Sequence, residues 1–255
     1  MWNEIFLVPF LTGLVLAVLL PVLGCYLRLR DEWLAALAYA HVAAAGALLA
    51  LLAHLPPALG GMLAAGAAGA GKRALAGRLA GGAAYAFLLL AGWALAVLLT
   101  ANQPMAERLG HALFDGQLYF ADAGQLPWIV LWLLAALAVL ARLSRWLLLC
   151  HLYPDFFRAQ GRKSWPVQPG FNLLAALSLA LATMNLGVMG AFALVFVPPW
   201  LAFRRARNWR GGLLLATGFS VVAYGLAFFA ALHLDQPFGP VLALVVMGLA
   251  LLFAA

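Results

Sequence analysis

The stretch IFLVPFLTGLVLAVLLPVLGCYLRLR, residues 5–30, sets the pattern that the rest of the chain repeats. An apolar block covers residues 5–27, and the arginines Arg28 and Arg30 follow it. A helix needs roughly 20 apolar residues to cross the hydrocarbon core of a bilayer, so this block is long enough for one crossing. It is too long for the core of a signal peptide and lacks a basic leader, so we expect a retained membrane helix.

Basic residues recur in the same way after later apolar blocks. Of the 15 lysines and arginines, all except Arg108 fall in four short clusters. The clusters are Arg28 and Arg30; Lys72, Arg73 and Arg78; Arg142, Arg145, Arg158, Arg162 and Lys163; and Arg204, Arg205, Arg207 and Arg210. Short loops rich in lysine and arginine stay on the cytoplasmic side of an inserting membrane protein. The clusters therefore predict an orientation as well as a class of protein.

The blocks between the clusters predict how often the chain crosses the membrane. We place nine candidate spans near residues 5–27, 33–53, 57–71, 80–100, 127–149, 170–185, 187–203, 212–233 and 238–254. An odd number of spans puts the N-terminus outside and the C-terminus inside, and every basic cluster then lies in the cytoplasm. We therefore predict an all-α, polytopic helical bundle of about eight or nine transmembrane helices. We expect residues 1–255 to form one transmembrane domain in a bacterial inner membrane.

Composition supports this class. Hydrophobic residues make up 67% of the chain and charged residues 9%, and the mean hydropathy is +1.02. A water-soluble domain of this composition would have too little polar surface to cover itself. The isoelectric point near 10.0 reflects the basic loops, so we expect no nucleic-acid partner and a lipid bilayer instead.

Glycine and proline indicate which spans lie inside the bundle. The third, sixth and seventh spans are short and interrupted by these residues. Irregular helices persist at membrane depth where neighbouring protein or a water-filled cavity satisfies the freed backbone groups. Small residues are dense over 60–66 (GGMLAAG), which permits close approach between helix backbones. We expect these segments to face other helices or a pathway.

Two connections are longer than a turn requires. The external connection, residues 101–126, mixes polar and aromatic residues, and we expect a short interfacial helix that meets an external partner. The cytoplasmic connection, residues 150–169, has Asp155 as a candidate N-cap, Phe156 and Phe157 in the first turn, and Gly161 as a candidate C-terminal stop. The second pattern predicts a helix of one to two turns on the cytoplasmic face.

Few residues in the spans carry candidate chemistry. His41 lies in mid-span, where an ionisable group is costly enough to suggest function. A single histidine among alanines can also have a purely structural role, as a hydrogen-bond partner of a neighbouring helix. Met184, Asn185 and Met189 lie around Gly187, where their amide and thioether groups either contact a permeating ion or pack. His54, His111 and His233 lie at predicted outer ends, where loop histidines are usually only solvated.

Enzymatic motifs are absent. Residues 66–73 (GAAGAGKR) nearly spell a phosphate-binding loop, but Arg73 replaces the hydroxyl residue that holds magnesium and no strand precedes the segment. The chain has no zinc-protease motif, no Gly-x-Ser-x-Gly elbow and no pair of carboxylates within the spans. We therefore expect no enzyme and no permanently bound cofactor.

Four patterns occur together in this chain: LDQPFGP at 234–240, Gly187 with Pro198, His41 with Gly46, and the segment from Asp155 to Gly161. Together they resemble the permease subunits of metal-ion ABC importers of the zinc and manganese uptake type. Residues 234–240 (LDQPFGP) resemble the family's Leu-Asp-x-Pro-x-Gly-Pro motif. Gly187 followed by Pro198 is similar to its Val-Gly…Ile-Pro segment, and His41 with Gly46 keeps the spacing of its Asp-x-x-x-His-x-x-x-x-Gly element. The cytoplasmic segment resembles the family's Asp-Pro-x-x-Ala-x-x-x-Gly coupling segment, with candidate residues Asp155, Phe156, Phe157, Arg158, Ala159 and Gly161.

The resemblance implies a role for each matched residue. His41 would handle the transported ion, and the segment from Asp155 to Gly161 would couple to an ATPase. Structural or pathway roles would fall to Gly46, Met184, Asn185, Gly187, Pro198, Asp235, Pro237, Gly239 and Pro240. The family's aspartate, four residues before His41, is Leu37 here, and its proline before Gly46 is Ala45. Two ligands one helical turn apart share a face, so Leu37 removes half of the expected site.

The resemblance also implies an assembly. It predicts a homodimeric membrane core, two copies of a cytoplasmic ATPase below it and a periplasmic metal-binding protein above it. ATP-driven alternating access would move a divalent metal ion inward, and the permease would perform no chemistry itself. Two other interpretations stay open: a secondary transporter or channel that works without ATP, and a membrane scaffold that has lost transport. A secondary transporter typically has more ionisable groups at mid-membrane.

Overall fold

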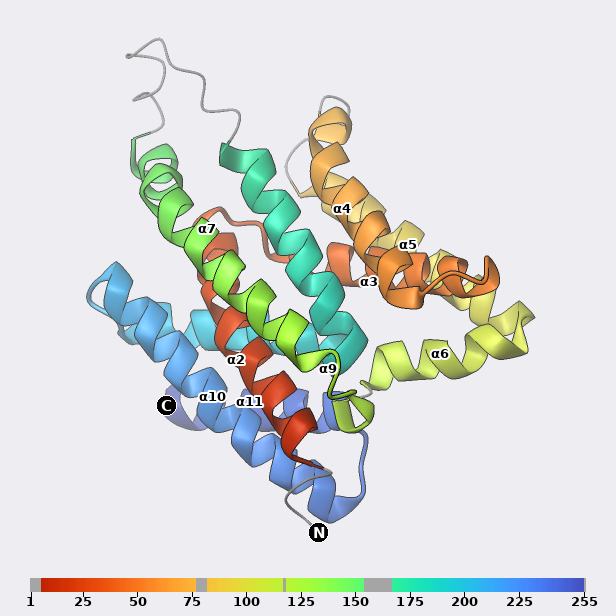
Figure 1. The fold of residues 1–255 in the computed structure, drawn as a ribbon. Coiled ribbons are helices and arrows are strands. Elements are labelled where there is room, and N and C mark those ends of the chain that lie inside the picture. The colour runs from red at the N-terminus through yellow and green to blue at the C-terminus, as the bar shows by residue number, and fades with distance from the viewer. Residues whose placement is uncertain (1–5, 77–81, 117, 154–166, 255) are drawn as a thin grey trace.

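A computed structural model describes residues 6–76, 82–116, 118–153 and 167–254, and every regular element within them is helical (Figure 1). The elements are α2 (Leu7–Leu29), α3 (Trp33–Leu52), α4 (Pro57–Ala76), α5 (Ala83–Asn102), α6 (Pro104–Asp115), the 3₁₀ turn η1 (Leu118–Phe120), α7 (Leu126–Leu152), α9 (Val167–Arg205), α10 (Trp209–Leu234) and α11 (Phe238–Ala254). The predicted all-α, polytopic class is confirmed.

Six of these helices are long and apolar enough to cross a membrane: α2, α3, α5, α7, α9 and α10. Helix α11 is apolar but shorter, with 17 residues. Helix α4 has 20 residues, so it begins where the third span was predicted, at 57, and continues past the predicted end at 71. The helix continues through Lys72, whose side chain pairs with the carboxylate of Glu32 just before α3, and it packs against α3 and α9.

The sixth and seventh predicted spans are the two halves of α9. No loop separates them, and Gly187 alone departs from helical geometry, with φ 77° and ψ 166°. Glycine adopts this conformation without a steric penalty, so one residue is enough to bend the chain sharply (Figure 1). The first half packs on α4, where Gly69 meets Asn172, and the second half packs on α2, where Gly24 meets Val195.

Basic residues gather at one end of the bundle, which we call the basic end. Arg28, at the end of α2, lies over the rings of Trp33 and Phe203 at 5.1 and 5.3 Å. Arg205, at the end of α9, donates a hydrogen bond to the carbonyl of Phe253 on α11. The ends of α2, α9 and α11 and the start of α3 therefore share one side, which is the predicted cytoplasmic side.

The predicted close approach between small residues is confirmed between α3 and α4. A Cβ atom on Gly46 would lie 2.6 Å from the carbonyl oxygen of Gly60, and one on Gly61 would lie 3.0 Å from the carbonyl oxygen of Ala43. Backbones this close allow no larger side chain. Gly46 therefore holds α3 against α4, which positions the middle of α3.

Candidate functional site

His41 lies in the middle of α3, with 5% of its surface exposed. Its Nδ1 atom is 2.8 Å from the carbonyl oxygen of Leu37. Because a carbonyl only accepts hydrogen bonds, we assign the proton of the neutral ring to Nδ1, which leaves the lone pair on Nε2. Metal-binding histidines typically have this arrangement, since the hydrogen bond fixes the tautomer and the orientation of the ring.

Apolar groups surround this histidine. Its ring centroid lies 6.1 Å from that of Phe114 on α6, and Gly92 of α5 packs against its backbone, where a Cβ atom would lie 2.8 Å from the carbonyl carbon. Leu37, Phe114 and Met184 all pack against the same apolar cluster. Among the described residues, no three His, Cys, Asp or Glu side chains lie close enough to hold a metal ion.

A cavity of about 390 Å³ opens between α4, α6, α7 and α9, away from the basic end. Its lining consists of Pro57, Ala58, Leu109, Leu113, Ala121, Gln125, Trp128, Ile129, Leu181, Met184 and Asn185. Two predicted pathway residues, Met184 and Asn185, are therefore brought together at a cavity, whereas His41 does not line it. The amide nitrogen of Asn185 donates to the carbonyl of Leu181 at 2.9 Å. Gln125 was not anticipated from the sequence.

Three glycines form a joint beside this cavity. A Cβ atom on Gly187 would lie 2.7 Å from the nitrogen of Gly116, and one on Gly239 would lie 2.6 Å from the carbonyl oxygen of Asp115. Gly116 also has a positive φ, 87°, where it ends α6. The bend of α9, the end of α6 and the start of α11 thus meet backbone to backbone. Gly187 and Gly239 were predicted, and Gly116 was missed although glycine commonly follows a helix.

The motif at 234–240 forms the turn between α10 and α11. Asp235 adopts a left-handed conformation, φ 50°, and its N–H bonds the carbonyl of Ala231, which ends α10. Pro237 precedes α11, and Pro240 lies in its first turn, where a missing N–H costs nothing. The turn places the buried Phe238 ring 5.7 Å from that of Tyr224. These motif residues therefore form part of the end of the bundle opposite the basic end, which we call the outer end.

Pro198 and its neighbour Pro199 lie inside the second half of α9. A proline in a helix interior has no N–H, so the carbonyl of Val195, four residues before Pro199, loses its helical partner. Gly24 of α2 packs directly against that carbonyl. The pair explains why α2 and α9 can lie so close, and Gly24 is a residue that sequence reasoning missed.

A charged network at the basic end was also missed. Glu32, at the start of α3, accepts from Lys72 of α4, from Arg30 at 2.9 Å and from the hydroxyl of Tyr85 on α5 at 3.1 Å. The three charged side chains are only 12 to 17% exposed. One carboxylate at the start of α3 thus links the ends of α2, α4 and α5.

The predicted coupling segment, Asp155 to Gly161, lies outside the described residues and stays a prediction. The helices on either side of it both reach the basic end, because Cys150 of α7 and Gln168 of α9 line a pocket with Arg30. The predicted helix in the external connection is confirmed as α6, which begins with Pro104 at its first turn and exposes Glu107, Arg108 and His111. His54 and His233 are also exposed.

Membrane-length helices packed through glycines, with a partly polar cavity between them, are the construction of a multi-pass membrane protein. Comparison with known sequences then gives the family. The chain belongs to the ABC 3 transport family, whose sequence model matches residues 3–255. It is thus similar throughout its length to the membrane permeases of ABC transporters, which are not themselves catalytic.

Individual relatives agree with this assignment. The chain is 26% identical to the chelated iron transport system membrane protein YfeD of Yersinia pestis, over 95% of this chain and 84% of that protein. Its fold is similar to a structure described as PsaBC from Streptococcus pneumoniae in complex with Fab, with a TM-score of 0.86, 18% identity, and coverage of 99% of this chain and 91% of that one. A second structure is described as an inward-facing conformation of a putative metal-chelate type ABC transporter. It gives a TM-score of 0.78 and 19% identity, and the match covers 99% of this chain and 87% of that one.

Proposed function

We propose that this chain is the permease subunit of an ABC importer for divalent metal ions in a bacterial inner membrane. Two copies would form a homodimer, with two cytoplasmic ATPase subunits at the basic end and a periplasmic metal-binding protein at the opposite end. ATP-driven alternating access would carry the ion inward. Zinc and manganese are the cargoes implied by the sequence motifs, and the name of the Yersinia relative adds iron to the ions that an experiment should compare.

The observation that carries the proposal is the hydrogen bond between Nδ1 of His41 and the carbonyl of Leu37. A neutral imidazole with its Nδ1 proton held by the Leu37 carbonyl presents Nε2 as a ligand for a borderline metal ion such as zinc. Because Leu37 replaces a carboxylate, the ion would be held weakly, which suits a pathway that must release it. No resident cofactor is part of this proposal, since the metal ion is cargo.

The cavity beside Met184 and Asn185 is the proposed opening of the path from the periplasm. Its amide and thioether groups offer weak, exchangeable contacts to a cation. The glycine joint at Gly187 lies next to it, so a rotation of one half of α9 relative to the other would change the shape of this opening. The path would then pass toward His41.

The segment with Asp155, Phe156, Phe157, Arg158, Ala159 and Gly161 is the proposed docking helix for the ATPase. Phe156→Ala together with Phe157→Ala should leave the permease folded and lower the ATP hydrolysis that transport stimulates. Normal coupling in that variant would place the docking surface elsewhere.

The direct test of the site is metal uptake by His41→Ala, with His233→Ala as the matched control because His233 is exposed at the end of α10. We expect uptake of zinc, manganese or ferrous iron to fall in His41→Ala at unchanged protein amount, and to match the parent in His233→Ala. Equal uptake by both variants across a range of ion concentrations would make His41 a packing residue. Copurification of an ATPase with the parent chain tests the assembly independently.

A further inference from the structure

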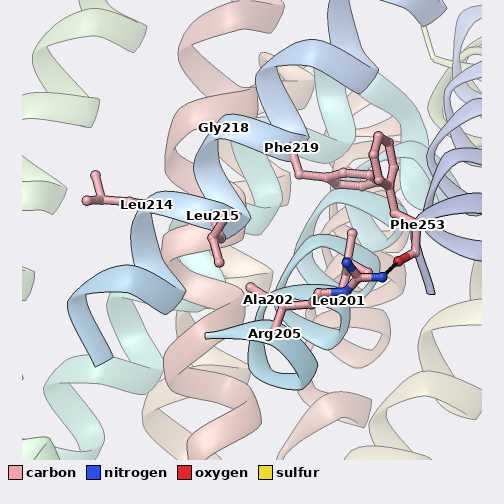
Figure 2. A pocket seen from close by; sticks show the side chains of 8 residues that line it. All are labelled: Leu201, Ala202, Arg205, Leu214, Leu215, Gly218, Phe219 and Phe253. Atoms are coloured by element: carbon pink, nitrogen blue, oxygen red, sulfur yellow. Dashed lines mark hydrogen bonds between the residues drawn. The ribbon is translucent and has the colours of Figure 1, made fainter. Parts of the chain in front are cut away.

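A groove of about 330 Å³ runs between the second half of α9, α10 and α11 near the basic end (Figure 2). Its lining residues, all labelled in the figure, are Leu201, Ala202, Arg205, Leu214, Leu215, Gly218, Phe219 and Phe253. Apart from Arg205, every lining side chain is apolar or absent. The groove is therefore an apolar channel with one cation beside it.

Gly218 creates the middle of the groove. A Cβ atom on Gly218 would find no heavy atom within 4 Å, so the glycine leaves open space rather than permitting a helix contact. Leu214, one turn earlier on α10, is 75% exposed, and Phe253 is 56% exposed. The groove thus opens to the surroundings of the bundle, which are lipid acyl chains at this depth in a membrane.

Arg205 is fixed where the groove meets the basic end. Its guanidinium donates to the carbonyl oxygen of Phe253, which is the dashed bond in Figure 2, and this bond places the cation over the groove. Three more arginines are exposed nearby: Arg204 at the end of α9, Arg207 in the connection to α10 and Arg210 in the first turn of α10. Arg204 also stacks over the Trp200 ring at 5.0 Å.

Among the residues that the structure describes, these four arginines have no carboxylate partner. Both ion pairs found among the described residues use Glu32, which is occupied by Arg30 and Lys72. The sequence contains no Asp or Glu between Trp200 and Leu234. A cluster of arginines that is not paired with carboxylates of the protein, and that lies at the level of the headgroups of the inner leaflet, favours binding of anionic lipid headgroups.

We propose that the groove binds an anionic phospholipid of the cytoplasmic leaflet. An acyl chain would lie over Gly218 and between Leu214 and Phe253, and the phosphate would be bound by Arg205 with support from Arg204. The shape accounts for the chain and the charge accounts for the headgroup, because basic pockets between membrane helices on the cytoplasmic side suit such headgroups. The bound lipid would link α9, α10 and α11 at the basic end. This site is separate from the proposed metal pathway.

Two pairs of variants test the two halves of the proposal. Gly218→Leu fills the groove without a change of charge, and Gly225→Leu is its control on the same helix, because a Cβ atom there also meets nothing within 4 Å and Gly225 does not line the groove. Arg205→Gln removes the cation, and Arg210→Gln removes an equal charge outside the lining. All four variants keep the full chain.

Native mass spectrometry of the purified full chain would measure retention of phosphatidylglycerol, with phosphatidylcholine of the same acyl chains as the neutral-headgroup comparison. We expect phosphatidylglycerol to bind about tenfold more tightly, Gly218→Leu to weaken it about tenfold, and Arg205→Gln to abolish the preference between the two lipids. Gly225→Leu and Arg210→Gln should stay within about twofold of the parent.

Three results would overturn the proposal. Unchanged phosphatidylglycerol retention by Gly218→Leu would show that the basic surface binds lipid without the groove. Equal effects of Arg205→Gln and Arg210→Gln would show that net charge alone decides binding. A change of oligomeric state in Gly218→Leu, with lipid retention unaltered, would show that a second copy of this chain occupies the groove.

Discussion

Replacement of Gly187 by alanine would place a side chain where the glycine joint has no room. The backbone at φ 77° and ψ 166° is a conformation essentially restricted to glycine, and a residue with a Cβ atom there costs about 1–3 kcal/mol. The added Cβ atom would also lie 2.7 Å from the nitrogen of Gly116 and 2.7 Å from the carbonyl oxygen of Phe114. Overpacking of this kind costs a further amount of about 1–3 kcal/mol.

The assay is thermal unfolding of the purified protein in one detergent at one scan rate, since membrane proteins commonly unfold irreversibly. The two costs together are about 2–6 kcal/mol. For a chain of this size, each kcal/mol lowers Tm by about 2–4 °C, so Gly187→Ala should lower Tm by about 4–24 °C. Gly248→Ala is the control, because α11 is helical there and a Cβ atom meets nothing within 4 Å. It should leave Tm unchanged or raise it slightly. A Tm for Gly187→Ala equal to that of Gly248→Ala would refute the claim that the glycine joint has no room for a side chain at position 187.

Three further predictions concern the basic end, the outer end and the orientation. Glu32→Gln should lower stability by about 1–3 kcal/mol because it leaves Arg30 and Lys72 without their shared carboxylate. The control Glu107→Gln, exposed on α6, should leave Tm unchanged in the same thermal unfolding assay, and equal changes of Tm in the two variants would contradict the network. Burial raises the pKa of Tyr119 to about 12, so the folded protein keeps a proton that the unfolded chain releases near pH 10, and stability falls as pH rises from about 10 to 12. Tyr119→Phe should reduce that fall in Tm, and a pH profile of Tm identical to the parent's would show that Tyr119 does not contribute. Cysteines placed at Asp122 and at Arg207, in a background without Cys25 and Cys150, should react with an impermeant reagent from outside and from inside respectively, and the reverse labelling would reject the orientation.

The sequence was sufficient for features that repeat along the chain. Apolar blocks and basic clusters are periodic and local, so the all-α class, the gathering of Arg28 and Arg205 at one end, and a helix in the external connection could all be predicted. Gly187 was predicted as an interruption because a glycine between two apolar blocks serves no purpose in a plain lipid-facing helix. The close approach near Gly60 followed from the density of small residues.

Features that depend on a partner far away in the chain were not accessible. Gly24 matters because Pro199, far along the sequence, frees the carbonyl of Val195, and no local pattern joins the two. Glu32 lies between two predicted spans in the sequence, and only the fold brings Lys72 and Tyr85 to it. The length of α4 was underestimated in the same way, because the pairing of Lys72 with Glu32 joins residues far apart in the sequence.

The central claim is ATP-driven import of a metal ion, and reconstitution tests it most directly. The permease and its ATPase would be placed together in liposomes, with ATP on the ATPase side and the metal-loaded binding protein on the other side. The account predicts accumulation of zinc, manganese or ferrous iron against its gradient only while ATP is hydrolysed, and a lower rate with His41→Ala. Equal movement of the ion with and without ATP hydrolysis would contradict the account and identify the chain as a channel or secondary transporter.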